Sequence, residues 1–221
     1  MKKILIIIVS LIWVLGSAGC DKKPEAGRIS NDWKSFEFEL DGVVYKYPWS
    51  FNDFATNGWR IMDDADDDID PNSQGFDFYM MLNDNHYDEE YRYYALITVQ
   101  FDNRSDEIKK MKDCDIMWLN FQKIPPELNL DINMDHVAYE LILAKGITWG
   151  STEAEVIAAY GDVEENFKAQ RDEMKVMQYY TLSEDNFLSI MHLIFYKDAL
   201  YSVNLYRYYV YDGYEHHGLQ R

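Results

Sequence analysis

Basic residues are scarce in this chain, and their shortage argues against two kinds of partner. Lysine and arginine number 21 against 39 aspartates and glutamates, which gives a formal net charge of -18 over 221 residues. Nucleic acids are bound through Lys and Arg that neutralise phosphates, and anionic lipid surfaces attract the same residues. The sequence therefore argues against nucleic acid and against a folded surface that binds anionic membranes, whereas it permits a basic partner or divalent cations.

The motifs of common enzymes are also missing. The chain has no G-x-S-x-G nucleophile elbow and no glycine-rich phosphate loop, and its five histidines lack the spacing that a zinc site favours. Cys114 lies between Asp113 and Asp115, whose negative charges raise the pKa of a thiol and weaken it as a nucleophile. We therefore expect a protein that is not an enzyme and that holds no metal or other cofactor.

One acidic run, residues 66–77, resembles a calcium-binding loop in part. Acids stand at positions 1, 3, 5 and 12 of the run, and Ca²⁺ prefers hard oxygen ligands on a flexible loop. Pro71, however, occupies the position where an EF-hand needs glycine, and Asp77 replaces the usual glutamate. We interpret the run as a solvated acidic loop.

Long hydrophobic runs are confined to residues 4–15, which follow Lys2 and Lys3 and precede the small residues 16–19. A positive start, a short apolar stretch and small residues form the pattern of a secretory signal peptide. The run is shorter than the roughly 20 residues of a membrane-spanning helix. We assign residues 1–19 to a cleaved signal peptide, with an uncleaved membrane anchor as the less favoured alternative.

Residues 17–20, Ser-Ala-Gly-Cys, resemble the lipobox of bacterial lipoproteins, in which the cysteine is acylated and becomes the mature N-terminus. On this interpretation Cys20 is the lipidation site, residues 20–32 form a polar tether, and Cys114 is an unpaired, buried thiol. The alternative is cleavage after Ala18, which leaves Cys20 able to form a disulfide with Cys114 in an oxidising compartment. The favoured interpretation predicts an extracytoplasmic, membrane-anchored protein.

Alternating apolar residues predict a body rich in strands. Residues 34–40 alternate phenylalanine and leucine with polar residues, and Asp41-Gly42 is a hairpin turn before a second strand at 43–47. We expect an α+β fold in which short helices pack on one face of an antiparallel sheet. Further strands are predicted at 75–82, 92–102, 114–121, 174–182, 187–196 and 200–209, the last three as a meander.

Two short helices interrupt the strands, and each follows a tryptophan and a hydroxyl cap. Ser50 caps a helix at 51–56, while Thr152 and Glu155 form a capping box before a helix that ends at Gly161. The two places lie about 100 residues apart, which motivates the hypothesis of two tandem units. The predicted organisation is a unit at 33–122, a linker at 123–136, a unit at 137–211 and a flexible tail at 212–221.

Residues 146–161, GITWGSTEAEVIAAYG, and the later strands ending FYKDALYSVNLY resemble the repeat of the beta-lactamase inhibitory protein fold. They are also similar to the SmpA/OmlA outer-membrane assembly lipoproteins. The resemblance implies short helices packed on a curved antiparallel sheet, often in tandem, and non-enzymatic protein binding. In the first half, a pattern of similar lipoproteins is matched at Leu40-Asp41-Gly42, Tyr45, Pro48, Ser50-Phe51 and Asp53.

Tyrosine is frequent, with 18 in the chain, and two clusters at 91–94 and 206–211 combine it with arginine. Alternate residues of a strand point to opposite faces, so each cluster presents tyrosine beside arginine, a composition enriched at protein interfaces. The simpler alternative is strand-forming residues that cover a sheet. We predict that the sheet face opposite the helices binds a protein partner in the cell envelope, with solute or glycan binding as the alternative. The predicted binding residues are Tyr93, Trp118, Tyr179, Tyr206 and Tyr208.

Overall fold

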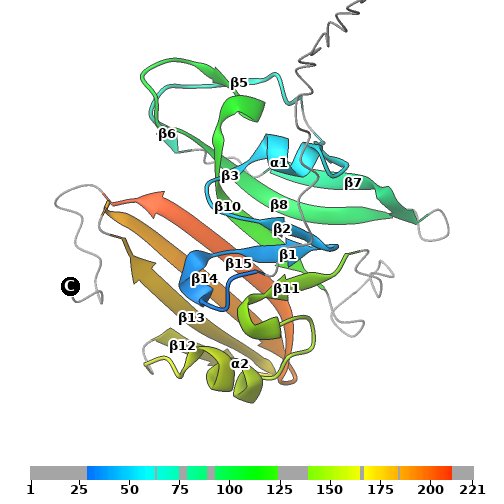
Figure 1. Ribbon diagram of the computed structural model, residues 1–221, viewed down its shortest axis with the longest axis vertical. Coiled ribbons are helices and arrows are strands. Elements are labelled where there is room, and N and C mark those ends of the chain that lie inside the picture. The colour runs from blue at the N-terminus through cyan, green and yellow to red at the C-terminus, as the bar shows by residue number, and fades with distance from the viewer. Residues whose placement is uncertain are drawn as a thin grey trace, which may run out of the picture.

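One large antiparallel sheet organises the protein (Figure 1). The computed structural model describes residues 29–62, 64–74, 79–88, 93–123, 139–164, 167–183 and 185–210. The ten strands of the sheet are β3 (Trp49–Ser50), β4 (Trp59–Ile61), β6 (Ser73–Gln74), β7 (Tyr79–Asp88), β8 (Tyr93–Asn103), β10 (Asp115–Gln122), β12 (Lys168–Arg171), β13 (Met174–Leu182), β14 (Phe187–Tyr196) and β15 (Ala199–Tyr209). Eight of them lie in the order β12-β13-β14-β15-β10-β8-β7-β4, while β3 pairs with β10 and β6 pairs with β8.

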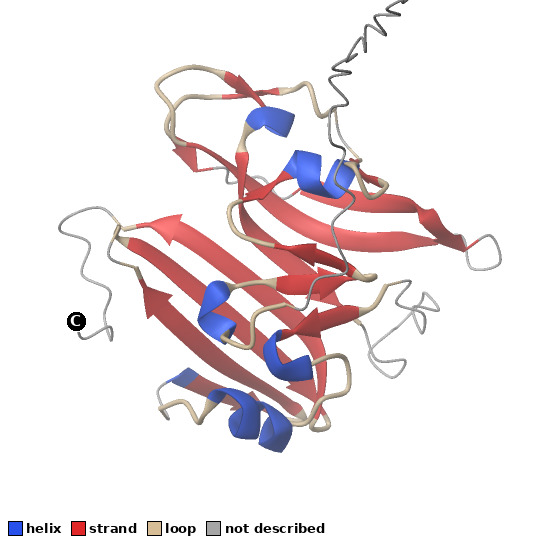
Figure 2. Ribbon diagram, in the orientation of Figure 1, coloured by secondary structure: helices blue, strands red, loops and turns tan. Residues whose placement is uncertain are grey.

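Smaller elements cover one face of this sheet. In a three-stranded sheet, β1 (Phe38–Leu40) lies between β2 (Val43–Tyr45) and β11 (Leu141–Leu143). Strands predominate and the helices are short (Figure 2), which confirms the prediction of an α+β fold and shows it to be dominated by sheet. The remaining elements are α1 (Phe51–Ala55), α2 (Glu153–Tyr160), η1 (Trp33–Ser35), η2 (Met111–Asp113), η4 (Ala144–Gly146) and the strand pair β5 (Asp68–Ile69) and β9 (Lys109–Lys110).

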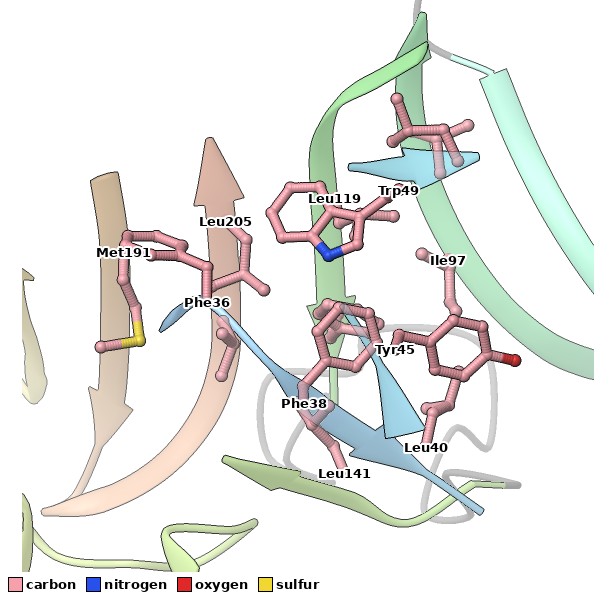
Figure 3. Close-up of a cluster of buried hydrophobic side chains, with 14 of the residues drawn as sticks. Phe36, Phe38, Leu40, Tyr45, Trp49, Ile97, Leu119, Leu141, Met191 and Leu205 are labelled. Atoms are coloured by element: carbon pink, nitrogen blue, oxygen red, sulfur yellow. The ribbon is translucent and has the colours of Figure 1, made fainter. Parts of the chain in front are cut away.

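The core fills the space between the two sheets (Figure 3). Alternate residues of β1, Phe38 and Leu40, point inward and are 0% and 1% exposed. They meet inward-facing residues of the large sheet such as Leu119 and Leu205, and the same cluster includes Val156 of α2. The small sheet and both α-helices therefore bury the same face of the large sheet.

Both α-helices begin with a capping box, as the sequence predicts for the second. The Ser50 side chain accepts a hydrogen bond from the backbone N–H of Asp53, and the Thr152 side chain accepts one from the backbone N–H of Glu155. In return, each acid accepts a hydrogen bond from the backbone N–H of the cap residue. These bonds satisfy backbone N–H groups that the first helical turn leaves without partners. Helices this short are unstable alone in water, so their positions depend on apolar residues that dock them on the sheet.

Several predicted boundaries differ from the structure. The segment predicted as a strand at 34–40 begins with η1, and Phe36 has a positive φ of 54°, so that only residues 38–40 pair as a strand. The strand predicted to end at residue 82 is longer than expected, because β7 continues through Asp88. Strand β12 was not predicted, since it is a mostly exposed edge strand without apolar alternation.

Strands β10 and β15 join the two halves of the sequence into one sheet. In the first half of the sequence, four strands lie side by side in the order β4-β7-β8-β10, and β10 is the last of them. In the second half, four strands lie in the order β12-β13-β14-β15, and β15 is the last of them. Strands β10 and β15 pair antiparallel, with Leu119 opposite Leu205 and Asn120 opposite Asn204. The sheet is therefore continuous between the predicted units at 33–122 and 137–211.

The predicted leader and anchor lie outside the described residues. This applies to residues 1–19, to Cys20, to most of the predicted linker at 123–136 and to the predicted tail at 212–221. Among the residues that the structure describes, no helix combines the length and the hydropathy needed to cross a bilayer.

Candidate functional site: an uncharged sheet face

The large sheet has a second face, which points away from the small sheet and the helices. Strand alternation and register define it, because the neighbouring residues on each strand enter the core. We call it the open face. It consists of Val176, Gln178, Tyr180 and Leu182 of β13, Leu188, Ile190, His192 and Ile194 of β14, Ser202, Asn204, Tyr206 and Tyr208 of β15, Trp118, Asn120 and Gln122 of β10, and Thr98 and Gln100 of β8.

None of these positions carries an acidic side chain, a lysine or an arginine, although 27% of the chain is Asp, Glu, Lys or Arg. At the borders of the same face, alternation and register place Asp102 of β8, Asp115 of β10 and Arg171 of β12, so the face is uncharged at its centre only. Burial lowers the pKa of His192 below its ordinary value, so its imidazole is neutral at neutral pH. The centres of protein interfaces are likewise depleted in charge and enriched in aromatic residues. The open face thus differs in composition from the rest of this acidic protein.

A row of polar side chains crosses the middle of the open face. Gln178, His192, Asn204, Asn120 and Thr98 lie opposite one another in that order on five successive strands. The Nδ2 atom of Asn120 donates to Oδ1 of Asn204 at 2.7 Å, and Nε2 of His192 lies 3.0 Å from Oε1 of Gln178. Both asparagines are only 7% exposed. Buried polar side chains that satisfy one another hold fixed orientations, so the row is a rigid feature of the face.

An aromatic pair lies beside the polar row. Trp118 and Tyr206 are opposite each other on β10 and β15, with ring centroids 5.8 Å apart, and the Tyr206 ring is 5.1 Å from the ring of His192. Burial raises the pKa of Tyr206, which keeps the phenol neutral. Tyr208 follows two residues later on the same face. All three residues lie on the face opposite the helices, as predicted, but Trp118 is only 9% exposed, whereas an exposed residue was expected.

The other two predicted residues are Tyr179, which lies on the covered face, and Tyr93, whose side chain is not described. The prediction that Tyr179 is a binding residue of the open face is wrong, because Tyr179 lies on the covered face of β13 and is 4% exposed. Its hydroxyl donates to the carbonyl of Gly161 at 2.7 Å, and its ring packs edge-on against Tyr160. Tyr93 begins β8, but its side chain lies outside the described residues. The neighbouring Tyr180 occupies the open face instead.

The polar row was missed by the sequence prediction, which singled out aromatic residues. Asn120 and Asn204 are 84 residues apart in the chain, and each is one polar residue within an ordinary strand pattern. His192 lies on the face of β14 that points away from the core, whereas Met191, Leu193 and Phe195 point into the core. Only the pairing of β10 with β15 brings the row together.

A charged corner borders the open face where β8 and β10 meet. Asp102 lies opposite Asp115 in the sheet, and Arg104 bridges them, with Nε 3.0 Å from Asp102 and Nη2 2.6 Å from Asp115. Asp102 is 6% exposed, and burial raises the pKa of its carboxyl above the ordinary value despite the favourable charge of Arg104. The guanidinium therefore offsets the cost of burying a carboxylate beside a second acid.

A cavity of about 770 Å³ lies beside the small sheet and is a second candidate site. The rings of Tyr139 and Trp149 form part of its wall, with centroids 6.2 Å apart. The indole Nε1 of Trp149 is buried without a hydrogen-bond partner. This nitrogen is shielded from solvent, so the rings and not the N–H are what the wall offers to a small ligand. The remaining lining residues are Asp41, Lys123, Glu140, Ile142, Gly146 and Thr148.

The described residues offer little support for metal or thiol chemistry. No three His, Cys, Asp or Glu side chains among them converge as metal ligands. In the acidic loop, Asp66 and Asp68 form ion pairs with Lys112 and Lys110. Cys114 is a free thiol, 3% exposed, and burial raises its pKa to about 11, which makes the reactive thiolate rare at neutral pH.

Comparison of the chain with protein-family models, curated proteins and solved structures finds no match. The resemblance to the beta-lactamase inhibitory protein fold and to the SmpA/OmlA lipoproteins therefore stays a prediction.

Proposed function

We propose that the protein is a non-catalytic lipoprotein of the cell envelope that binds a protein partner through the open face. One observation carries this proposal: the centre of the open face consists of aromatic, amide and aliphatic side chains without charge, in a chain with a net charge of -18. Outward-facing charges keep proteins soluble and monomeric. Their absence from the centre of one face is explained if a partner covers that face in use, and Trp and Tyr are the residues that most often anchor such contacts.

Alanine substitution on the open face tests the partner proposal. Trp118→Ala, Tyr206→Ala and Tyr208→Ala should each weaken capture of the partner from envelope extracts by roughly 10- to 30-fold, because interface anchors contribute about 2 kcal/mol. Capture is measured by quantitative mass spectrometry on immobilised protein at several concentrations. Thermal unfolding of each variant by circular dichroism separates lost binding from lost folding.

Ile108→Ala is the matched control, because Ile108 is 59% exposed and lies outside the open face. Its capture curve should coincide with that of the unmodified protein. Unchanged capture by all three open-face variants, with folding intact, would reject the proposal. The alternative of a solute- or glycan-binding protein would then take its place, supported by the cavity that Tyr139 and Trp149 line.

We further propose that the protein is anchored in the membrane through an acylated Cys20. The competing disulfide with Cys114 is disfavoured, because Cys114 is 3% exposed and its Sγ donates to the carbonyl of Lys110 at 3.4 Å within the fold. Mass spectrometry of detergent-extracted protein should find a mature chain that starts at Cys20 with a diacylglyceryl group. An unmodified Cys20, or a peptide that links Cys20 to Cys114, would contradict this anchor.

We also infer that the chain consists of two tandem units derived by duplication. Each half has a capped helix followed by four neighbouring strands. The turns before the helices are alike as well, since Asp41 and Gly42 have φ of 51° and 79°, while Lys145 and Gly146 have 56° and 80°. An experimental structure with α1 and α2 on opposite faces of the sheet would contradict the duplication.

A further inference from the structure

Arg207 near the end of β15 is held between aromatic rings. Its Cζ atom lies 3.7 Å from the ring centroid of Tyr47 and 5.3 Å from that of Phe187. The Phe187 ring also contacts the guanidinium of Arg104, whose Cζ is 5.0 Å from the ring centroid. Two of the few cations of this acidic chain thus contact one phenyl ring.

The two arginines differ in their charge partners. Arg104 forms ion pairs with Asp102 and Asp115. Among the residues that the structure describes, no carboxylate pairs with Arg207, although the chain contains 39 acids. Its Nε is buried without an acceptor. A half-buried guanidinium has lost part of its hydration, so an ion pair with a carboxylate would recover free energy that the described fold leaves unused.

The geometry fixes which end of Arg207 a ligand would meet. Since Nε is buried and Cζ lies 3.7 Å from the ring centroid of Tyr47, the two terminal nitrogens remain for end-on contact with an anion. A guanidinium presents such a pair of donors at the spacing of carboxylate oxygens, whereas a lysine ammonium does not. Tyr47 and Phe187 supply an apolar surface beside the same donors.

We propose that Arg207 binds the carboxylate of a ligand whose attached apolar group contacts Tyr47 and Phe187. A carboxylate is favoured over a phosphate, because a dianion is repelled more strongly than a monoanion by a protein with a net charge of -18. Arg207 points to the face of β15 opposite Tyr206 and Tyr208, so this site is separate from the open face. The site goes beyond the proposed partner-binding function and does not depend on it.

Titration of the isotopically labelled full chain with benzoate tests the site. The arginine Nε–Hε signal of Arg207 should shift and reach saturation with benzoate, and acetate should shift it at higher concentrations only, because it lacks the ring. Arg171, an exposed arginine of β12, serves as the internal reference and should show no saturable shift. A signal of Arg207 that changes no more than that of Arg171, or that inorganic phosphate saturates at lower concentration than benzoate, would overturn the proposal.

Variants separate recognition by the guanidinium from simple charge attraction. Arg207→Lys keeps the charge and much of the aliphatic stem, and it should weaken benzoate binding at least tenfold as measured by saturation-transfer difference NMR. Arg207→Gln should abolish binding, and Arg171→Gln should leave it unchanged, with thermal unfolding checked for each. Equal affinity of Arg207→Lys and the unmodified protein would reject the bidentate contact.

The source of the carboxylate is distinguished with a peptide. The tripeptide Gly-Gly-Phe with a free C-terminus should compete with benzoate, and its C-terminal amide should not. Tighter binding of the tripeptide than of benzoate assigns the site to a chain terminus, and weaker binding assigns it to a small aromatic acid. Competition by the amide that equals competition by the acid would contradict the carboxylate site.

Discussion

Replacement of Phe38 by alanine is expected to lower the free energy of unfolding by about 3–5 kcal/mol, the usual cost of removing a buried aromatic side chain. Phe38 is 0% exposed and joins the small sheet to the large one. Its ring is stacked 5.3 Å from Tyr45 and lies 5.0 Å from Phe121 of β10. Urea unfolding followed by tryptophan fluorescence measures the change.

The control for this prediction is the exposed side chain of Ile108. Ile108→Ala should change the free energy of unfolding by less than about 0.5 kcal/mol, because surface truncations remove few contacts. A loss below about 1 kcal/mol for Phe38→Ala would mean that the small sheet is not integral to the core. Both substitutions shorten an apolar side chain, so the difference between their losses of unfolding free energy measures the effect of burial.

Replacement of Arg104 by methionine is expected to destabilise the protein by about 2 kcal/mol at neutral pH, since a nearly buried carboxylate then lacks its cation. Asp102 is 6% exposed and lies opposite Asp115, so removal of Arg104 leaves two acids facing each other. This expected destabilisation is smaller than that for a fully buried ion pair, because the Arg104 side chain is itself 31% exposed.

The destabilisation caused by Arg104→Met should increase as pH rises. Burial already raises the pKa of Asp102 above the ordinary 3.8, and removing the guanidinium raises it further. At pH values between the pKa of Asp102 in the unfolded state and its higher pKa in the folded state, the native protein binds more protons than the unfolded chain. The contribution of Asp102 to the free energy of unfolding therefore falls as pH rises and recovers as pH falls. Urea unfolding at a series of pH values from 4 upward should show a steeper decline for Arg104→Met than for the unmodified protein.

A second substitution provides the control for this pH dependence. Adding Asp102→Asn to Arg104→Met removes the buried charge, so it should restore part of the lost stability and abolish the extra pH slope. Parallel pH profiles for Arg104→Met and the unmodified protein would show that Asp102 is not the responsible group.

Local sequence patterns predicted much of the fold, because helix caps, tight turns and strand alternation depend on residues a few positions apart. Thr152 and Glu155 form a capping box through bonds that span three positions, and Asp41-Gly42 adopts the positive φ angles of a tight turn. The meander at 174–209 was predicted from alternation and turn residues in the same way. Strand β7 was cut short because its polar residues look like a loop until β8 pairs with them.

The sequence by itself determined the acidic charge, the strand content, the helix caps and the strands that carry Trp118, Tyr206 and Tyr208. Tertiary structure alone decided which side of each strand is covered, so that Tyr179 is buried beneath α2 while Tyr180 lies on the open face. It also decided that Asn120 meets Asn204 and that Arg207 lies against Tyr47 without a carboxylate. The physical reason is that hydrogen bonds within a turn are local, whereas burial and register depend on segments that pack together from distant parts of the chain.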